Sequence, residues 1–262
     1  MIDLHCHLLP GIDDGAKSLD DALAMARMAV DDGIQVTACT PHIYPGLYEN
    51  STESIVGALE ALRGALAEAA IPLRLVAGAD AHLTPVLLTR LQDGSAPTLG
   101  DTRYFLLEPA HHVAPRGFSA QVASYLAGGF VPVITHPERL TWIDQHYDDF
   151  VQAARHGAWL QVTSGSLTGD FGSDAQYWAE KLVDEGWVHI VATDAHGIRA
   201  RRPELAKGAR AAAKLVGTEE AQLMVDVRPR AILGDTPPNQ VVPPPALREG
   251  GKAKRSFWSR LL

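Results

Sequence analysis

Short runs of apolar residues alternate along the chain with longer segments in which apolar residues recur every three or four positions. The short runs predict seven strands, in the segments IDLHCH, IQVTACT, LRLVAGA, RYFLLE, VPVITH, WLQVTS and VHIVATDAH. The longer segments predict helices near residues 18–33, 52–70, 119–128 and 175–186, and one that runs through residue 150. This alternation indicates a parallel sheet, and so many repeats favour an α/β barrel that is closed or nearly closed.

The first of these helices has well-marked ends. Ser18, followed by Asp21 three residues later, is typical of a capping box, and Gly33 is a natural stop. The face that we expect to be buried consists of Ala22, Met25, Ala26, Ala29 and Val30.

The length and composition fit a single domain with a sizeable core. The chain has 262 residues, of which 46% are hydrophobic and 21% are charged. After residue 235 the sequence becomes rich in proline (DTPPNQVVPPPALREGG) and then basic. We therefore assign residues 1–235 to the barrel, and residues 236–262 to a proline-rich linker and a basic tail that we expect to be flexible.

The net charge of −8 argues against nucleic acid as the main partner. The charge is uneven, because the final segment REGGKAKRSFWSRLL carries five Lys or Arg and one Glu. No apolar run approaches the ~18–20 residues that a membrane-spanning helix needs. The chain has two cysteines, Cys6 and Cys39, and such sparse usage suits a reducing cytoplasm, where we expect the protein.

Polar side chains gather where the predicted strands end. A parallel barrel brings the carboxyl ends of its strands to one face, which is where active sites form. His5 and His7 lie two apart at the end of the first strand, so they point to the same side. The other strand-end residues are His42, Asp80, Glu108, His136, Asp194 and His196.

We interpret this set as a metal centre. A single strand-end histidine is more often a structural hydrogen-bond partner, and an isolated DDG is usually a turn, but the whole set is hard to assign to chance. Imidazole and carboxylate without thiolate favour zinc, manganese or iron. Because the donors exceed the needs of one ion, we expect two or three ions bridged by a carboxylate such as Glu108, which suits hydrolysis.

Cationic residues follow the same strand ends and favour a phosphoryl substrate. Arg139 lies three residues after His136, and the last predicted strand is followed by Arg199, Arg201 and Arg202. Arginine suits bidentate binding of phosphate, although each of these residues is equally well explained as a solvated loop residue or a salt bridge at a helix start. The sequence contains no P-loop, no GxSxG elbow and no cysteine followed six positions later by arginine.

The motifs MIDLHCHLLPGIDDG, TPHIYPG, GAD, LLEP, THPER and ATDAH, in this order, resemble those of the PHP (polymerase and histidinol phosphatase) superfamily. More narrowly, residues 1–235 resemble the bacterial manganese-dependent protein-tyrosine phosphatases of the CpsB/YwqE type, which belong to capsule and exopolysaccharide biosynthesis. The resemblance implies a single-domain, distorted TIM-like (β/α)7 PHP barrel. It also implies a site with Mn2+ as two or three ions, with Zn, Fe, Co or Mg as alternatives.

Carried over by position, the resemblance implies a specific set of metal ligands: His5, His7, Asp14, His42, Asp80, Glu108, His136, Asp194 and His196. Asp13 is implied as a residue that supports a ligand, or as an alternative ligand. Arg139 and one arginine of the RARRP stretch are implied to bind phosphate. Because this stretch offers Arg201 by its spacing and Arg202 by the proline that follows it, both are candidates.

Asp80 is a departure from the family pattern. The resemblance places a glutamate at this position, and the shorter aspartate leaves the bridging geometry and the metal preference open.

The resemblance also implies hydrolysis of phosphotyrosine on a protein. The implied substrate is the phosphotyrosine cluster of a membrane tyrosine kinase that governs polysaccharide export. The basic tail, with Phe257, Trp258, Leu261 and Leu262, would suit contact with an anionic membrane surface, although a solvated, disordered end is the better explanation of the two. Two other functions stay open: a phosphatase of small esters such as histidinol phosphate, and a catalytically silent PHP scaffold.

Overall fold

Parallel strands form the centre of the molecule. The structure is a computed structural model that describes residues 1–248. Within that range the strands are β1 (Ile2–Cys6), β2 (Val36–Cys39), β3 (His42–Ile43), β4 (Arg74–Ala77), β5 (Asp80–His82), β6 (Tyr104–Glu108), β7 (Val131–Thr135), β8 (Trp159–Thr163) and β9 (Ile190–Ala192). They form a three-stranded sheet in the order β1-β2-β4 and a six-stranded sheet in the order β3-β5-β6-β7-β8-β9. Strands such as β6 and β7 are buried along their whole length, as in parallel sheets covered by helices.

Two of the seven predicted strands are each interrupted in the middle. The second leads from β2 through Thr40 and Pro41 into β3, and the third leads from β4 through Gly78 into β5. Proline cannot donate a hydrogen bond to a neighbouring strand. Its carbonyl accepts one instead, from the backbone N–H of Asp80 at 3.1 Å. Beyond the interruption, His42 and Asp80 stand opposite each other in register on β3 and β5.

The ends of β1 and β9 lie side by side, although they come from opposite ends of the described chain. Cys6 and Ala195 form an isolated parallel bridge. The backbone N–H of Asp194 donates to the carbonyl of His5 at 2.8 Å, and that of His7 donates to the carbonyl of Ala195 at 2.9 Å. These bonds bring residues of the first and last strands to one site.

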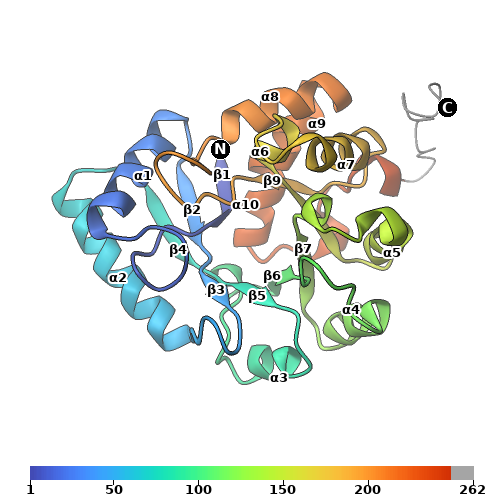
Figure 1. The fold of residues 1–262 in the computed structure, drawn as a ribbon, viewed down its shortest axis with the longest axis horizontal. Coiled ribbons are helices and arrows are strands. Elements are labelled where there is room, and N and C mark those ends of the chain that lie inside the picture. The colour runs from blue at the N-terminus through green and yellow to red at the C-terminus, as the bar shows by residue number, and fades with distance from the viewer. Residues whose placement is uncertain (249–262) are drawn as a thin grey trace.

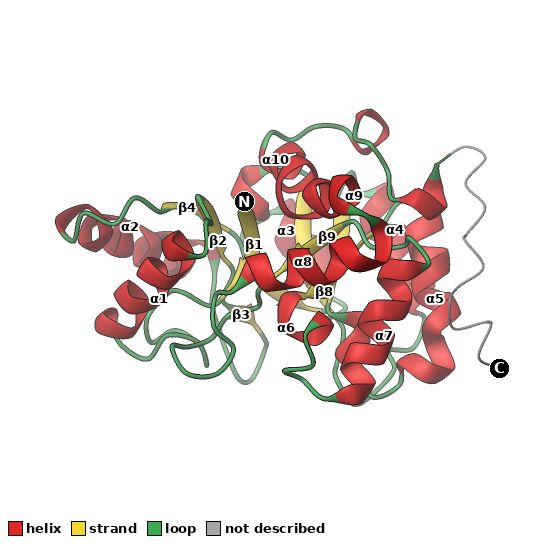
Figure 2. Cartoon of the chain, turned by 90° about the horizontal axis from the view of Figure 1, so that it is seen from above, coloured by secondary structure: helices red, strands yellow, loops and turns green. Residues whose placement is uncertain are grey.

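Helices surround the strands (Figure 1). Seen from above, α1 and α2 lie on one side of the strands and α4, α5 and α7 on the other (Figure 2). None of the helices within residues 1–248 is both long enough and apolar enough to cross a membrane. The α-helices are α1 (Leu19–Asp31), α2 (Thr52–Glu68), α3 (Leu87–Gln92), α4 (Phe118–Ala127), α5 (Ile143–Arg155), α6 (Ser164–Leu167), α7 (Ser173–Asp184), α8 (Leu205–Val216), α9 (Thr218–Gln222) and α10 (Arg228–Leu233).

The helices that periodicity predicts are present. The hydroxyl of Ser18 accepts a hydrogen bond from the backbone N–H of Asp21 at 3.1 Å, which confirms the predicted start of α1. On the predicted face of α1 all residues are buried except Val30, which is half-buried. Short 3₁₀ or π segments add η1 (Leu99–Asp101), η2 (Pro137–Arg139), η3 (Leu223–Val227), η4 (Pro238–Gln240) and η5 (Pro245–Leu247).

Alternate strand residues belong to a small apolar cluster, here called the inner cluster, which also includes Leu99, Ile232 and Val241 from outside the strands. Leu106 of β6 and Val133 of β7 belong to this inner cluster. Phe105, the residue before Leu106, belongs instead to a larger cluster that packs against the outer helices. Glu108 lies two residues after Leu106, and Thr135 lies two residues after Val133, at the carboxyl ends of β6 and β7. Because side chains two apart on a strand share a face, both point to the same side as the inner cluster. The polar site is therefore a direct continuation of the inner core.

Strand β1 departs from this alternation. Ile2 and Leu4 belong to the inner cluster, so strict alternation would point His5 outward. The pairing of β1 with β2 shifts register after Asp3, and such an irregularity re-aims the side chains that follow it. His5 accordingly faces inward, where its Nδ1 lies 2.9 Å from Oε1 of Gln161 on β8.

Residues 236–248 pack against the body of the molecule. The carbonyl of Thr236 accepts a hydrogen bond from the hydroxyl of Tyr104 at 2.6 Å. These residues are the first part of the segment predicted as a linker, and the domain boundary after residue 235 stays a prediction. The basic tail, residues 249–262, lies outside the described residues.

Arg228 anchors this segment and supports our first prediction. Its buried guanidinium pairs with Glu220 at 2.6 Å and donates to the carbonyls of His189, Val242 and Pro243. Arg228→Met removes all of these bonds. Among the described residues, the buried carboxylate of Glu220 then keeps only its ion pair with Arg248. We expect the free energy of unfolding to fall by about 3 kcal/mol. Denaturant unfolding of the metal-free protein measures the change.

Arg230→Met is the matched control for this prediction. Arg230 also forms an ion pair, with Asp226, but its side chain is 63% exposed, so water replaces the lost contact. We expect its unfolding midpoint to stay close to that of the unmodified protein. Similar midpoints for the Arg228 and Arg230 variants would contradict the anchoring role.

Candidate metal centre

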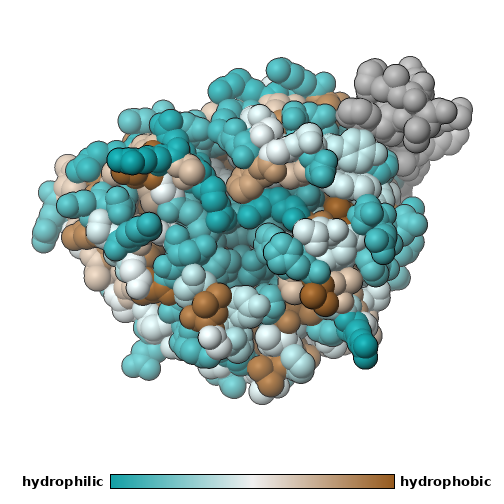
Figure 3. Space-filling model, viewed as in Figure 1, coloured by the Kyte–Doolittle hydropathy of each residue, from teal (hydrophilic) through white to brown (hydrophobic). Residues whose placement is uncertain are grey.

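The predicted ligands meet at one face of the molecule, in or just after the strand ends. All of them except Asp14 and His42 have buried side chains. Figure 3 shows a hollow lined by hydrophilic residues in the middle of one face. The residues brought together are His5, His7, Asp14, His42, Asp80, Glu108, His136, Asp194 and His196.

The deepest part of the centre joins two histidines to two aspartates. Nε2 of His5 lies 3.2 Å from Nε2 of His7. The same atom of His5 lies 3.4 Å from Oδ2 of Asp80 and 3.2 Å from Oδ1 of Asp194. Oδ1 of Asp194 is also 3.3 Å from Nε2 of His7. Two imidazole nitrogens and two carboxylate oxygens therefore face one another.

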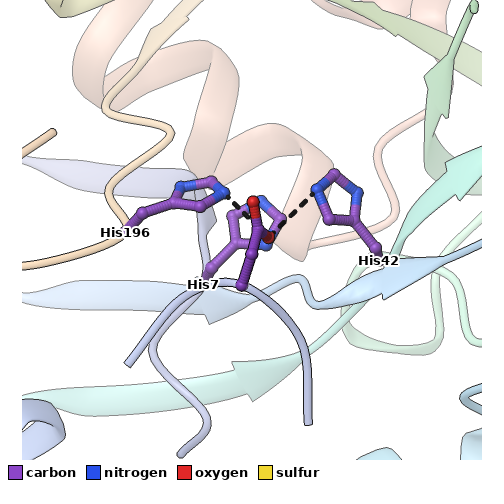
Figure 4. A group of neighbouring side chains, drawn as sticks. His7, His42 and His196 are labelled. Atoms are coloured by element: carbon purple, nitrogen blue, oxygen red, sulfur yellow. Dashed lines mark ion pairs between the residues drawn. The ribbon is translucent and has the colours of Figure 1, made fainter. Parts of the chain in front are cut away.

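A second group lies nearer the surface, around Asp14. Oδ1 of Asp14 lies 3.5 Å from Nε2 of His42 and 3.4 Å from Nε2 of His196. Figure 4 shows these two imidazoles pointing at the carboxylate from opposite sides, with His7 between them. The ring centroid of His7 is 4.5 Å from that of His42 and 3.8 Å from that of His196. Asp14, which only the family resemblance suggested as a ligand, thus lies among histidines of the set.

Asp80 and Glu108 connect these groups to His136. Nδ1 of His42 lies 3.3 Å from Oε2 of Glu108 and 3.5 Å from Oδ2 of Asp80. Nε2 of His136 lies 3.8 Å from Oδ2 of Asp80 and 4.0 Å from Oε1 of Glu108. Asp80, although shorter than the glutamate expected there, therefore still faces His5, His42 and His136.

The donor atoms fit divalent metal ions. Bonds of ~2.0–2.3 Å to one ion place its ligand atoms ~3–4 Å apart, and the distances in this centre lie in that range. Nδ1 of His42, Oδ2 of Asp80 and Nε2 of His196 are buried and have no hydrogen-bond partner among the described residues. Buried polar atoms are normally paired, so these three fit the role of donors to a cation. The mixture of nitrogen and oxygen donors favours Zn, Mn or Fe.

Electrostatic interactions inside the centre are strong. Burial lowers the pKa of His5, but Asp80 and Asp194 outweigh burial and raise it to about 9. Burial and the charge of Arg139 lower the pKa of His136 to about 4. Burial raises the pKa of Asp194, but nearby cations, with His5 first, hold it well below its usual range. Asp194 is therefore ionised at neutral pH and attracts cations.

Two of the predicted ligands have backbone conformations that residues other than glycine seldom adopt. The φ angle of His136 is 34° and that of Asp194 is 50°. A left-handed residue turns the chain sharply, here just after β7 and β9. Each such conformation costs about 1–3 kcal/mol, and strain of this kind collects at functional sites.

Two polar residues hold histidine rings from behind. Oδ2 of Asp13 lies 2.7 Å from Nδ1 of His7 and accepts the backbone N–H of His42 at 3.1 Å. Oε1 of Gln161 contacts Nδ1 of His5 in the same way. Such partners fix the tautomer and orientation of a metal-binding histidine. From the sequence, Asp13 was expected either to support a ligand or to act as an alternative ligand. Gln161 was not selected, although a polar residue in the middle of the buried strand β8 is a signal that could have identified it.

Two arginines reach the centre at Asp194. Arg139 and Arg201 both donate to its Oδ2, Arg201 at 2.6 Å. The guanidinium of Arg139 stacks 4.3 Å above the ring of Phe171, and that of Arg201 lies 5.9 Å from it. Arg202 instead pairs with a neighbouring glutamate at 3.1 Å, and its side chain is 46% exposed. Of the two candidates in RARRP, Arg201 contacts a predicted ligand, and the sequence analysis did not select Phe171.

A cavity of about 240 Å³ opens beside these groups. Predicted ligands, His111 and the two arginines that contact Asp194 line part of it, and an apolar wall is formed by Tyr44, Leu47 and Tyr48. Leu47 is 62% exposed and Tyr44 is 37% exposed, so both offer apolar surface at the opening. The sequence analysis did not select this wall, because nothing in the local pattern connects it to the strand ends.

The sequence matches the family described as "Capsular polysaccharide synthesis, CpsB/CapC" over residues 1–234. The chain belongs to the CpsB/CapC family. The tyrosine-protein phosphatase YwqE of Bacillus subtilis (strain 168) is 37% identical over 202 residues, which cover 77% of this chain and 79% of YwqE. The tyrosine-protein phosphatase CpsB of Streptococcus pneumoniae is 28% identical over 240 residues, which cover 90% of this chain and 99% of CpsB.

A solved structure is also similar over most of this CpsB/CapC member. The two share 32% identity with a TM-score of 0.86, and the match covers 90% of this chain and 96% of the other. That structure comes from a study of YwqE from Bacillus subtilis and CpsB from Streptococcus pneumoniae, described as unique metal-dependent tyrosine phosphatases. The comparisons confirm the family resemblance and the mixed α/β single-domain fold with parallel sheets.

Asp13→Asn tests how the centre is supported. The change removes the charge behind His7 but keeps the size of the side chain. We expect the affinity for divalent metal to fall about 10–100-fold, because a neutral amide holds and polarises the imidazole less well. Competition with a chromophoric chelator measures this affinity. Asp31→Asn, at the exposed end of α1, is the matched control, and equal affinities for the two variants would contradict the supporting role.

Proposed function

We propose that this chain is a metal-dependent protein-tyrosine phosphatase. The observation that carries the proposal is the convergence of Arg139 and Arg201 on Asp194, within a set of metal-type ligands and beside a cavity. Transfer of a phosphoryl group depends on cations that bind its oxygens and on groups that position the attacking oxygen. The names of the relatives YwqE and CpsB as tyrosine-protein phosphatases support the same activity.

We infer that two or three divalent ions belong to the centre. Mn2+ is the first candidate, with Zn, Fe, Co and Mg as alternatives. Bound ions supply a Lewis acid for the phosphoryl group and lower the pKa of a water molecule toward neutrality. The proposed ligands are His5, His7, Asp14, His42, Asp80, Glu108, His136, Asp194 and His196, supported by their donor types and spacing.

The arginines bind and orient the phosphate in this proposal. A guanidinium has five N–H donors, so Arg139 and Arg201 can each hold Asp194 and still donate to a phosphoryl oxygen. Stacking on Phe171 restricts the movement of Arg139. As the ester bond breaks, negative charge is spread over the phosphoryl oxygens, and the two guanidinium groups stabilise it.

The apolar wall favours an aryl ester. Tyr44, Leu47 and Tyr48 offer contact to a phenyl ring beside the phosphate site. A phenol has a pKa of ~10, so phenolate departs with less help from a proton donor than an alkoxide does. Histidinol phosphate is an alkyl ester, whose leaving alkoxide needs more help from a proton donor, which makes it the weaker candidate.

We also propose a physiological setting. The family description favours a substrate in capsular or exopolysaccharide synthesis, and we place the phosphotyrosine on a membrane tyrosine kinase of that process. Cys6 and Cys39 are free and buried, in keeping with the reducing cytoplasm. The membrane contact expected of the tail falls on residues 249–262, outside the described part of the chain.

We propose that the strands form the distorted (β/α)7 barrel that the family resemblance implies. The backbone bonds that join the ends of β1 and β9 support this arrangement, as do the two sheets that share continuous segments at β2–β3 and β4–β5. A barrel accounts for a site built from residues of seven consecutive strand segments.

Alanine variants of the arginines test phosphate binding. Arg139→Ala and Arg201→Ala should each lower kcat/KM for a phosphotyrosine peptide about 100-fold or more, because each removes a donor that faces developing charge. Arg202→Ala is the matched control and should remain close to the unmodified enzyme. Steady-state kinetics of the Mn-loaded proteins measure the effect. Equal losses in the Arg201 and Arg202 variants would overturn the assignment of Arg201.

Metal removal tests the activity itself. Chelator treatment should abolish hydrolysis of the peptide and Mn2+ should restore it, but not in His136→Ala, which lacks a proposed ligand. The same preparations are assayed with histidinol phosphate. Hydrolysis of histidinol phosphate alone would favour the small-molecule phosphatase. No hydrolysis of either substrate with Mn, Zn, Fe, Co or Mg would favour the silent scaffold.

A further inference from the structure

His111, which the sequence analysis did not select, lies beside the metal centre in the loop after β6. Its Nε2 is 3.5 Å from Oε1 of Glu108. Its ring centroid is 5.0 Å from that of His136. One donor atom from each of Glu108, His111 and His136 lies within 4.8 Å of the other two. The three residues therefore form a compact group of two imidazoles and one carboxylate.

The two oxygens of Glu108 face different histidines. Oε1 lies 3.5 Å from His111 and 4.0 Å from His136. Oε2 lies 3.3 Å from His42 and 3.7 Å from His82. A carboxylate with nitrogen donors on both sides can bridge two positions, and His111 belongs to the Oε1 side. The distances from Oε1 to His111 and to His136 are those expected between ligands of one ion.

The loop that carries His111 is fastened to the segment after β7. The carbonyl of His111 accepts hydrogen bonds from the backbone N–H of Thr141 at 3.0 Å and from its hydroxyl at 3.1 Å. The carbonyl of the preceding residue, Ala110, accepts the indole N–H of Trp142 at 2.9 Å. The same segment begins at His136, so the two imidazoles are held near each other by backbone contacts as well as by Glu108.

We propose that His111 is a further metal ligand, which with Glu108 and His136 holds a divalent transition-metal ion on the solvent side of the centre. The proposal deepens the proposed function and rests on its metal dependence. Two imidazoles and one carboxylate suit Zn, Fe, Co or Mn better than Mg or Ca, which prefer oxygen. The side chain of His111 is 31% exposed, so this part of the centre can be reached from solvent.

A simpler role for His111 is a hydrogen bond to Glu108, and the two roles predict different metal binding. A hydrogen-bond donor only orients the carboxylate, and a glutamine side chain can supply such a donor. A ligand nitrogen contributes a bond to the ion, and glutamine does not replace it at a transition metal. His111→Gln therefore separates the two roles, and His111→Ala removes both.

The test is a titration of the chelator-stripped protein with Co2+, followed by visible absorption and by elemental analysis of bound metal. We expect His111→Ala and His111→Gln to bind one equivalent of Co2+ at least tenfold more weakly than the unmodified protein does. We also expect the Co2+ absorption bands of both variants to differ from those of the unmodified protein. His112→Ala is the matched control, because His112 is the exposed neighbour whose ring lies 6.2 Å from that of His111. It should bind like the unmodified protein.

Two outcomes would overturn the proposal. One is unchanged affinity, stoichiometry and absorption in both His111 variants, and the other is loss in His111→Ala with full retention in His111→Gln. Circular dichroism of each variant checks that it has folded. Phosphotyrosine hydrolysis is assayed separately: its absence would overturn the proposed function, whereas the Co2+ titration decides the role of His111 independently of activity.

Discussion

Asp80, Glu108 and Asp194 are buried together, and this concentration of negative charge is the constraint on which the rest of the structure depends. Parallel strands create it, because their carboxyl ends all lie at one face. A buried carboxylate is stable only when it is paired with positive charge or hydrogen-bonded. Histidines and arginines from distant segments supply part of that charge. We propose that divalent ions supply the rest, and buried atoms without a hydrogen-bond partner among the described residues, such as Oδ2 of Asp80, support this proposal.

Asp194 links the candidate metal centre to the proposed phosphate site. Its Oδ1 faces His5 and His7, and its Oδ2 accepts hydrogen bonds from Arg139 and Arg201. The carboxylate that we propose as a metal ligand therefore also positions the groups that we propose to bind phosphate. A change in its position would alter both proposed sites together, and its backbone has the left-handed conformation that collects at functional sites.

The first and last strands depend on a second buried carboxylate, that of Asp3. Oδ1 of Asp3 accepts the backbone N–H of Thr193 at 3.0 Å, and Oδ2 accepts its hydroxyl at 2.5 Å. Burial raises the pKa of Asp3 to about 6, although these bonds oppose the shift. The contact lies at the irregularity of β1 and one residue before Asp194. It thus ties the first strand to the residue that precedes Asp194, next to the irregularity of β1.

The sequence by itself determined the order of strands and helices and the identity of most candidate ligands, because periodicity and position at a strand end are local properties. It did not determine the register shift in β1, since that shift depends on pairing with β2. Nor did it separate Arg201 from Arg202, or select Phe171 and His111, because these roles arise from contacts between segments far apart in the chain. Local pattern specifies which residues lie at the strand ends, and only tertiary packing decides which side chains meet there.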